Sequence, residues 1–466
     1  MKLFGTSGIR GVYLRDITPE LMHKLGLALS TFLGNKGSII IGGDCRLSTQ
    51  LLKLSLATGL MAGGITVFDA GLIPIPVLAY GIVRHGCIGG VYVTASHNPP
   101  EYNGVKVFDA RGLELRSSDE KYIEELIEGN SFKYVDWPSL GSYSILDGLN
   151  EEYLKELSRR LMPSEIRKRI KVLLDTANCA ASITTPKLLS NLGAHVITIN
   201  SNIDGRFPGR EPEPRPDVLE RYIPVARSLD VDVYLAHDGD GDRLAVIDPV
   251  DGFVKQDRII ALMFKYKLIK EGGGYVVASI DCGNAVREVV EKYGGKLIVS
   301  KLGKIHEALI EHNALMAAEP WKLIDPSWGL WIDSIYQVGL IARMMIEEGK
   351  SINELLRDIP NYPQARYSIK VPSNLKMGVY EYLRDYIESK APNTASVLRI
   401  DGLRIDYDDS SWVLIRPSGT EAKVRIYAEG KDVRRVKELV DDVIRACRGY
   451  LKSRGMELEL DGALIP

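Results

Sequence analysis

Three short loops carry residues whose types and spacing suit phosphoryl-transfer chemistry. Ser96 lies in the segment Thr94-Ala95-Ser96-His97-Asn98-Pro99, directly after the apolar run 88–93. A hydroxyl on an exposed, stiff turn after a buried strand is how a chain displays a nucleophile or a phosphate carrier. Such a serine can equally satisfy local backbone groups. The interpretation therefore depends on the two other loops.

The second loop alternates acid and glycine, as Asp238-Gly239-Asp240-Gly241-Asp242-Arg243. Carboxylates at every second position can converge on one hard cation, and the glycines let the backbone curl around it. Oxygen ligands without thiols favour Mg²⁺ over zinc. An EF-hand calcium loop would need Gly after the third ligand and Glu at its twelfth position, where this chain has Arg243 and Pro249. The remaining alternative is a solvated acidic turn.

The third loop, Arg416-Pro417-Ser418-Gly419-Thr420, combines a guanidinium, two hydroxyls and glycine-enabled backbone amides. Such a group suits a phosphate dianion, and Arg425 can reach the same place. A plain hairpin with a surface arginine is the alternative. A serine, a hard-cation site and an anion-binding loop in one chain together indicate phosphoryl transfer.

Weaker signals surround the serine. Residues 5–11 form a glycine-flanked loop with Arg10 near the start of the chain. Lys106 follows the serine closely, either as an acid/base or charge partner for transfer at Ser96 or as an exposed strand lysine. Residues 44–48 are typical of a strand end with Ser48 as the N-cap of a helix, and that helix start can help to bind an anion.

Composition limits the class of protein. The chain has 466 residues, 45% of them hydrophobic and 26% charged, which predicts about three or four globular domains. A net charge of −2 gives no reason to expect nucleic acid or a membrane surface as a partner. Five scattered cysteines favour reduced thiols in a cytoplasm. We expect no signal peptide, and no uncharged apolar run approaches the ~20 residues of a membrane helix.

A strand–helix–strand pattern recurs three times, in residues 37–67, 171–197 and 274–299. Short β-branched runs that alternate with helical patterns predict βαβ units and largely parallel sheets. The alternative is a generic α/β chain without internal relationship. Ligands of such sheets bind beyond the carboxyl ends of the strands. We expect five polar residues there: Asp44, Ser96, Asp175, Asp238 and Asp281.

The predicted domains are residues 1–140, 141–249, 250–360 and 361–466. The last differs from the others, because strand patterns at 412–416 and 424–429 are followed by a helical pattern at 432–450. It is predicted to be a small α+β domain.

With these loops in hand, the chain resembles the α-D-phosphohexomutase superfamily from about residue 2 to about residue 450. The family's motifs occur in order: the N-terminal glycine loop at 5–11, the phosphoserine loop at 94–99, the metal loop at 238–243 and the phosphate loop at 416–420. Residues 204–214 also resemble the family. The resemblance implies three related mixed α/β domains and a C-terminal α+β domain around a central cleft.

The resemblance also implies an activity, that of a phosphosugar mutase, which is an isomerase. Ser96 would be phosphorylated, would pass its phosphoryl group to a sugar monophosphate, and would recover a phosphoryl group from the resulting bisphosphate. One Mg²⁺ per chain would be held by Ser96, Asp238, Asp240 and Asp242, with a sugar bisphosphate as activator. The implied catalytic residues are Ser96, Arg10, Lys106 and His97. The implied substrate-binding residues are Arg243, Lys304, Glu319, Trp321, Lys322, Arg416, Ser418, Gly419, Thr420 and Arg425.

One departure concerns the sugar. Relatives acting on glucose or mannose phosphates carry Gly-Glu-x-(Ser/Asn)-Gly where this chain has Ala317-Ala318-Glu319-Pro320-Trp321-Lys322. The bulkier Trp321 and the extra cation Lys322 in this sugar loop predict a different sugar or a narrower range of sugars. This form resembles an archaeal branch described as phosphoglucosamine mutase or phosphopentomutase. Glucosamine phosphates rank first, glucose or mannose phosphates second and pentose phosphates third.

Two other functions compete with the mutase. A Mg²⁺-dependent sugar phosphatase would hydrolyse the phosphoserine, and a sugar-phosphate sensor would bind without turnover. The distal phosphate loop favours reorientation over release, and the combination of Ser96, Lys106 and three acids argues against a sensor. The expected partners are small phosphosugars, with the chain a monomer or homodimer.

Overall fold

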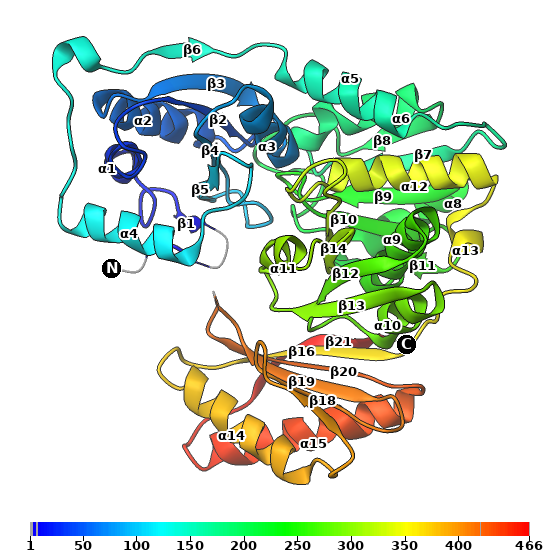
Figure 1. The fold of residues 1–466 in the computed structure, drawn as a ribbon. Helices are drawn as coiled ribbons and strands as arrows, with labels where there is room; N and C mark the ends of the chain where they lie inside the picture. The colour runs from blue at the N-terminus through cyan, green and yellow to red at the C-terminus, as the bar shows by residue number, and fades with distance from the viewer. Residues whose placement is uncertain (1–2, 6–7, 420, 466) are drawn as a thin grey trace. The chain divides into compact units, whose positions relative to one another are not determined.

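The strand–helix–strand pattern occurs three times in the structure, a computed structural model that describes residues 3–5, 8–419 and 421–465 (Figure 1). Strand β2 (Ser38–Gly43) pairs in parallel with β3 (Thr66–Leu72). The same pairing joins β7 (Lys171–Asp175) to β8 (His195–Ile199), and β12 (Gly274–Ser279) to β13 (Gly295–Ser300). Each second strand is reached through a helix, which is the crossover that parallel strands require.

The chain divides into two compact units. The first comprises Met1–Gln256 and Trp321–Arg357, and the second Asp257–Pro320 and Asp358–Pro466. The first unit begins with a six-stranded mixed sheet in the order β1-β5-β4-β2-β3-β6. The strands not yet given are β1 (Ile9–Val12), β4 (Gly89–Val93), β5 (Tyr102–Asp109) and β6 (Tyr143–Ile145).

Helices cover both faces of this sheet because its central strands are apolar on both sides. Ile39 and Ile41 share a core with α1 (Pro19–Phe32), α2 (Thr49–Ala62) and α4 (Ser117–Glu128). Ile40 points to the opposite face, where Gly81 of α3 (Ile75–Arg84) comes close to it. Strands buried on both faces read as continuous apolar runs, as expected for central parallel strands.

The first unit also contains a second mixed sheet, in the order β11-β10-β9-β7-β8. Strand β9 (Val233–His237) runs antiparallel to β10 (Leu244–Asp248), so residues 238–243 form the loop that joins them. The other elements are α5 (Leu149–Leu161), α6 (Thr185–Asn191), α7 (Pro216–Leu219), α8 (Ile223–Ser228), β11 (Gly252–Phe253) and 3-10 turns at Trp137–Ser139, Ala180–Ile183 and Glu220–Tyr222.

The segment Trp321–Arg357 closes the first unit with β15 (Lys322–Ile324), α12 (Ser334–Glu348) and α13 (Ile352–Leu355). Helix α12 packs against α5 and α6. Asp333 is the N-cap of α12 and accepts a hydrogen bond from the backbone N–H of Tyr336 at 2.8 Å. The same carboxylate accepts bonds from the side chains of Tyr153 and Trp328.

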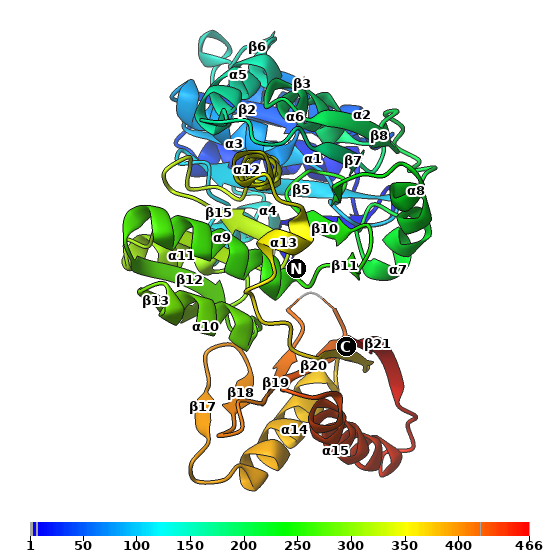
Figure 2. The same ribbon diagram turned by 90° about the vertical axis from the view of Figure 1, so that its right-hand side faces the viewer.

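In the second unit, β12, β13 and β14 (Met316–Glu319) form a parallel sheet with α9 (Gln256–Glu271), α10 (Asn284–Lys292) and α11 (Ile305–Glu311). The C-terminal part is an antiparallel sheet in the order β17-β18-β19-β20-β16-β21. Its helices α14 (Lys376–Lys390) and α15 (Val433–Lys452) pack side by side on one face (Figures 1 and 2). The strands are β16 (Gln364–Lys370), β17 (Ser396–Leu398), β18 (Leu403–Asp406), β19 (Trp412–Pro417), β20 (Lys423–Glu429) and β21 (Glu459–Ile465).

The predicted fold class, three related α/β parts and a C-terminal α+β part, is confirmed. Ser48 stands at the N-cap of α2, as predicted, but its side chain makes no capping hydrogen bond. Its hydroxyl instead accepts a bond from the Asn103 side chain at 2.8 Å. All five cysteines are free. Among the described residues, no helix is long and apolar enough to cross a bilayer.

Candidate active site

Ser96 lies in the loop that follows β4, beside the carboxyl end of the parallel strand β2. The sequence predicted an exposed turn, but Ser96 is only 1% exposed. Its φ of +52° is in the left-handed region, which costs a non-glycine residue about 1–3 kcal/mol unless its surroundings hold it there. Backbone strain of this kind is concentrated at functional positions.

The hydroxyl of Ser96 points at the metal loop, residues 238–243. Its Oγ lies 3.1 Å from Asp238 Oδ2 and 3.1 Å from Asp240 Oδ1, so its single proton can be donated to either carboxylate. The two backbones are also close, because a Cβ added to Gly239 would lie 2.8 Å from the carbonyl oxygen of Ser96. Glycine is therefore required at this approach.

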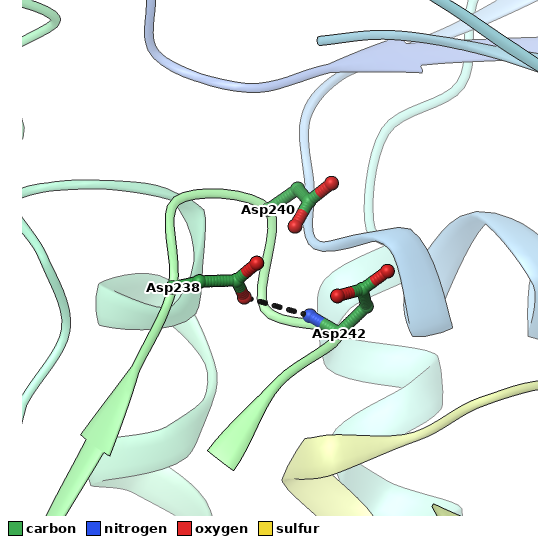
Figure 3. A group of neighbouring side chains, drawn as sticks. All are labelled: Asp238, Asp240 and Asp242. Carbon is green, nitrogen blue, oxygen red and sulfur yellow. Dashed lines mark hydrogen bonds between the residues drawn. The ribbon is translucent and has the colours of Figure 1, made fainter. Parts of the chain in front are cut away.

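The three acids of the metal loop converge from one hairpin turn (Figure 3). One ligand atom from each of Asp238, Asp240 and Asp242 lies within 4.8 Å of the others, and all three residues are buried. Asp238 Oδ1 accepts the backbone N–H groups of Asp242, at 3.2 Å, and of Arg243. Gly241, at a φ of +72°, allows the turn.

This donor set fits a hard divalent cation. Asp242 Oδ1 is buried and accepts no hydrogen bond from any residue that the structure describes, whereas the buried Asp240 Oδ2 has the Lys106 ammonium 3.2 Å away. Buried carboxylate oxygens without donors are costly unless a charge compensates them. Carboxylate oxygens are what Mg²⁺ prefers, and it usually completes its shell with water and phosphate oxygens.

The electrostatics of the three acids are unequal. Burial raises the pKa of Asp238 well above its ordinary value, and the carboxylates of Asp240 and Asp242 raise it further. Burial acts in the same direction on Asp242, but the ammonium groups of Lys106 and Lys322 outweigh it and hold the pKa of Asp242 well below its ordinary value.

Lys106 is a buried charge partner of the acids rather than an exposed strand lysine. Its residue is 1% exposed, and its Nζ lies 2.9 Å from Asp242 Oδ2 and 3.2 Å from Asp240 Oδ2. Burial alone would lower the pKa of Lys106, but these carboxylates raise it above its ordinary value. The group is therefore a cation at neutral pH.

Two arginines and a histidine complete the surroundings of Ser96. Arg10 donates to the Asn98 side chain at 3.3 Å, and Arg243 pairs with Glu213 at 3.2 Å while lying 3.9 Å from Asp238 and from Asp242. His97 Nδ1 lies 3.4 Å from Ser96 Oγ. Burial and the cations Arg243 and Arg10 lower the pKa of His97 well below its ordinary value, so its ring is neutral near pH 7.

Two residues of the predicted sugar loop lie at the second sheet. The indole of Trp321 packs against Phe253, with ring centroids 5.6 Å apart, and its backbone N–H donates to Gln256. Lys322 Nζ lies 3.7 Å from Asp242 Oδ2. The cation that the sequence assigned to the sugar is thus placed beside the metal loop.

The other predicted substrate residues belong to the second unit. Glu319 ends β14, is 5% exposed, and accepts the backbone N–H of Gly303 at 2.6 Å. Lys304 pairs with Glu307 at 3.0 Å. Glu319 is thus at the carboxyl end of β14 and Lys304 lies beyond that of the parallel strand β13, which is the edge where ligands of such sheets bind.

The predicted phosphate loop is the turn between β19 and β20. Arg416 and Arg425 are directly opposite each other in the register of these strands. Arg416 pairs with Asp401 at 2.9 Å and Arg425 with Glu421 at 3.1 Å. Ser418 is buried and Gly419 is exposed. Thr420 lies outside the described residues.

Several supporting residues escaped the sequence analysis. Ser334, the first residue of α12, donates to the carbonyl of Gly241 at 2.6 Å and contacts the ring of His237. Burial lowers the pKa of His237 to about 4, so it is a neutral support for the metal loop. Arg46 donates hydrogen bonds to backbone carbonyls of the phosphoserine loop, and Arg210 donates one to the carbonyl of His237, directly before the metal loop. The only signal for Arg46 was its place two residues after the strand-terminal Asp44.

Models of known protein families match most of the chain. Four domain models match in order: phosphoglucomutase/phosphomannomutase domain I at residues 1–134, domain II at 151–252, domain III at 255–362 and the C-terminal domain at 370–446. The chain belongs to the phosphoglucomutase/phosphomannomutase family. It is an isomerase, a phosphosugar mutase.

Individual relatives are similar over nearly their full length. A phosphopentomutase of Thermococcus kodakarensis is 40% identical over 443 residues, which is 95% of this chain and 96% of the relative. A protein named "Probable phosphoglucosamine mutase" from the same organism is 36% identical over 445 residues, 94% and 96%. A crystal structure of a phosphoglucomutase/phosphomannomutase family protein from Burkholderia thailandensis has a TM-score of 0.86 at 25% identity, covering 98% of both chains.

Proposed function

We propose that this phosphosugar mutase carries the transferred phosphoryl group on Ser96. The observation that supports this most directly is the distance of 3.1 Å from Ser96 Oγ to a carboxylate oxygen of Asp238 and of Asp240. A serine buried among the three acids of a metal loop is poorly explained as a residue that only satisfies local backbone groups. The strained backbone of Ser96 agrees with a functional position.

In the proposed reaction, a hydroxyl oxygen of a sugar monophosphate attacks the phosphorus of phosphoserine, and the bond from phosphorus to Ser96 Oγ breaks. The proton of the sugar hydroxyl passes to Ser96 Oγ, and a proton returns from Ser96 to the sugar oxygen in the second transfer. The product is a sugar bisphosphate. After this bisphosphate turns over, Ser96 Oγ attacks its other phosphoryl group and regains a phosphate. No atom is lost, and the sugar leaves with its phosphate at the other position. The same bisphosphate phosphorylates an unmodified Ser96, which makes it the proposed activator.

The residues around Ser96 divide the work of charge compensation. We assign Asp238, Asp240, Asp242 and Ser96 to one Mg²⁺ per chain, which when bound supplies positive charge to the phosphoryl oxygens. Lys106 is a permanent cation at the same carboxylates, and Arg10 and Arg243 lie around the loop. Neutral His97 orients the serine hydroxyl. Phosphoryl transfer needs this positioning and charge compensation more than it needs new covalent chemistry.

We assign the second phosphate to the phosphate loop of the second unit, and the sugar to residues near the sugar loop, 317–322. Arg416, Ser418, Gly419 and Thr420, with Arg425 across the hairpin, are proposed to hold the distal phosphate. Two opposed arginines on neighbouring strands support this, because a phosphate dianion can accept from both. Lys304, Glu319 and Trp321 are proposed to contact the sugar, and Glu319 provides carboxylate oxygens for its hydroxyl groups.

Two sugars are candidates. Glucosamine phosphates rank first from the Glu319-Pro320-Trp321-Lys322 loop and its archaeal resemblance. Pentose phosphates are favoured by a separate observation: of two Thermococcus kodakarensis relatives, the phosphopentomutase is the more similar, at 40% identity against 36%. We place the enzyme in the cytoplasm, as a monomer or homodimer acting on free phosphosugars, and five free cysteines support a reducing compartment.

Phosphorus NMR of the full chain with Mg²⁺ and a trace of sugar bisphosphate tests both parts. The substrates are the 6-phosphates of glucosamine, glucose and mannose, and ribose 5-phosphate. We expect conversion of one of them to its 1-phosphate. Release of inorganic phosphate would instead indicate a phosphatase.

Ser96→Ala is the matched variant for the carrier role. It should abolish conversion of every substrate and the phosphorylation of the protein and weaken Mg²⁺ binding, because one of the four proposed ligands is lost, while leaving thermal stability near wild type. Conversion by Ser96→Ala at a rate close to wild type would contradict the assignment of Ser96.

A further inference from the structure

Arg46, in the loop between β2 and α2, is bonded through every N–H of its guanidinium. It is 2% exposed. Nε donates to Asp44 Oδ2 at 2.9 Å. Nη1 and Nη2 donate to four backbone carbonyls, those of Ser96, Asn98 and Pro99 in the phosphoserine loop and that of Tyr102 at the start of β5, at distances from 2.5 to 2.9 Å.

Asp44 and Arg46 hold Ser96 on both sides of its Cα. The backbone carbonyl of Ser96 accepts from Arg46 Nη2 at 2.8 Å. The backbone N–H of Ser96 donates to Thr94 Oγ1 at 2.7 Å, and that hydroxyl donates to Asp44 Oδ2 at 2.7 Å. The ion pair therefore fixes the positive φ of Ser96 and the direction of its Oγ.

An equivalent pair supports the metal loop. Arg210 is 3% exposed, and its Nε donates to Asp175 Oδ2 at 2.9 Å. Its Nη2 donates to the carbonyl of His237, the residue directly before Asp238, at 2.5 Å. Its Nη1 bonds the carbonyls of Glu211 and Pro212. Asp175 ends β7, and Asp44 directly follows β2.

We propose that Arg46 and Arg210 are positioning residues for phosphoryl transfer. Each is anchored on an aspartate at the end of a parallel strand, and each fixes backbone at one reacting loop: Arg46 that of Ser96, and Arg210 that of His237, which directly precedes the metal loop. This inference rests on the proposed role of Ser96. Neither arginine is needed to touch the substrate, because all five guanidinium N–H groups of Arg46 and four of the five of Arg210 are bonded within the chain.

A guanidinium is required for this task because its five donors form a rigid, planar fork. Lysine keeps the charge but offers three donors from a single point. In Arg46→Lys, at least two of the five acceptors, Asp44 and the four carbonyls, lose their donor. Reacting groups misplaced by about 1 Å lose about 100-fold in rate, whereas uniform binding of the substrate is unaffected.

The test compares Arg46→Lys and Arg210→Lys with Arg404→Lys in the full chain. Arg404 is a matched control, since it is 3% exposed and bonds the carbonyls of Ile280 and Cys282. Among the described residues, none of its hydrogen-bond partners lies in the phosphoserine or metal loop. The measurements are thermal stability, Mg²⁺ affinity by calorimetry, the rate of Ser96 phosphorylation by sugar bisphosphate, and kcat and KM.

For Arg46→Lys we expect kcat and the phosphorylation rate to fall about 100-fold, with KM and Mg²⁺ affinity changed less than about threefold. For Arg210→Lys we expect Mg²⁺ to bind at least about tenfold more weakly, since the metal loop loses its anchor. Arg404→Lys should lower the melting temperature by a similar amount but leave the phosphorylation rate within about twofold. Equal rates in all three variants would overturn the proposal.

A second pair of variants keeps the test decisive if Arg46→Lys does not fold. Thr94→Val removes the hydroxyl that joins Asp44 to the Ser96 N–H, and Thr94→Ser keeps it. The proposal expects slow phosphorylation in Thr94→Val alone, and equal rates in the two would refute it. Failure of the proposed function is distinguishable, because wild-type protein would then show no phosphate on Ser96.

Discussion

Asp242 is the carboxylate on which two ammonium groups converge, from distant parts of the chain. Lys106 Nζ lies 2.9 Å from Asp242 Oδ2, and Lys322 Nζ lies 3.7 Å from the same atom. Unit charges about 4 Å apart interact by about 4 kcal/mol at the effective dielectric of a protein surface. Lys322 therefore competes with a metal cation for Asp242, although it also adds positive charge where a phosphoryl group would develop negative charge.

Lys322→Met tests this placement. We expect Mg²⁺ to bind roughly tenfold more tightly, because one competing cation is removed, and kcat to fall because a stabilising charge is lost. The order of preference among the sugar phosphates should stay the same. The measurements are Mg²⁺ titration by calorimetry and kcat/KM for each substrate.

Lys121→Met is the control, since Lys121 is 76% exposed and pairs with Glu125. It should change neither quantity. The sugar-loop interpretation of the sequence predicts the reverse for Lys322→Met, an altered order of sugars with unchanged Mg²⁺ affinity. That result would show that Lys322 acts in sugar recognition and not at the metal loop.

The sequence predicted the reactive groups better than their supports, for a physical reason. Ser96 and the three acids lie in short contiguous motifs, so a few neighbouring residues are enough to indicate their chemistry. The role of Arg46 depends on carbonyls some fifty residues away, and every residue has a carbonyl. Lys106 has the same difficulty: its burial comes from packing, and no local pattern distinguishes it from an exposed strand lysine.

At the scale of elements, the three related α/β parts share one arrangement, an ion pair between an arginine and an aspartate at the end of a strand. Asp44, Asp175 and Asp281 each stand at the carboxyl end of a first parallel strand. The first two pair with Arg46 and Arg210, and Asp281 pairs with Arg366 at 3.3 Å. The aspartates were predictable from strand periodicity. Their partners were not, because the three arginines occupy different places in the chain relative to the strands.

The approach of two loops gives a prediction at this scale. Gly239→Ala would place a Cβ 2.8 Å from the Ser96 carbonyl oxygen, which is itself held by Arg46. We expect the loops to separate by a few tenths of an ångström or more, with a loss of at least about tenfold in kcat and weaker Mg²⁺ binding. The measurements are steady-state kinetics and calorimetric titration.

Gly449→Ala is a suitable comparison, because a Cβ there would meet nothing within 4 Å. This glycine lies inside α15, where alanine is favoured by about 1 kcal/mol. That variant should be as active as wild type and at least as stable. An active Gly239→Ala with normal Mg²⁺ affinity would show that the loops tolerate a wider separation.

At the scale of the whole molecule, the first unit is assembled from two separate stretches of chain. The returning stretch is attached through Asp333, which accepts bonds from Tyr153, Trp328 and Trp331 as well as capping α12. Tyr80 of α3 stacks on Trp328 with ring centroids 5.8 Å apart. The next residue after Asp333 is Ser334, whose hydroxyl holds the metal loop. Assembly of the unit and positioning of the metal ligands are thereby coupled.

Asp333→Asn tests that coupling against Asp432→Asn. Both aspartates are N-caps, and asparagine caps a helix equally well, but the Asp432 side chain is 58% exposed and, besides capping α15, forms an ion pair with Arg434 at 4.0 Å. The carboxylate of Asp333 offers two acceptor oxygens to its donors, whereas the amide of asparagine offers one. Some buried N–H and O–H groups therefore lose their acceptor, which lowers the free energy of unfolding by about 2 kcal/mol or more. We expect Asp333→Asn to lower the melting temperature by about 4 °C or more and to weaken Mg²⁺ binding. Asp432→Asn should do neither. Calorimetry of the full chain measures both effects, and a destabilised Asp333→Asn with normal Mg²⁺ affinity would separate the assembly of the first unit from its metal loop.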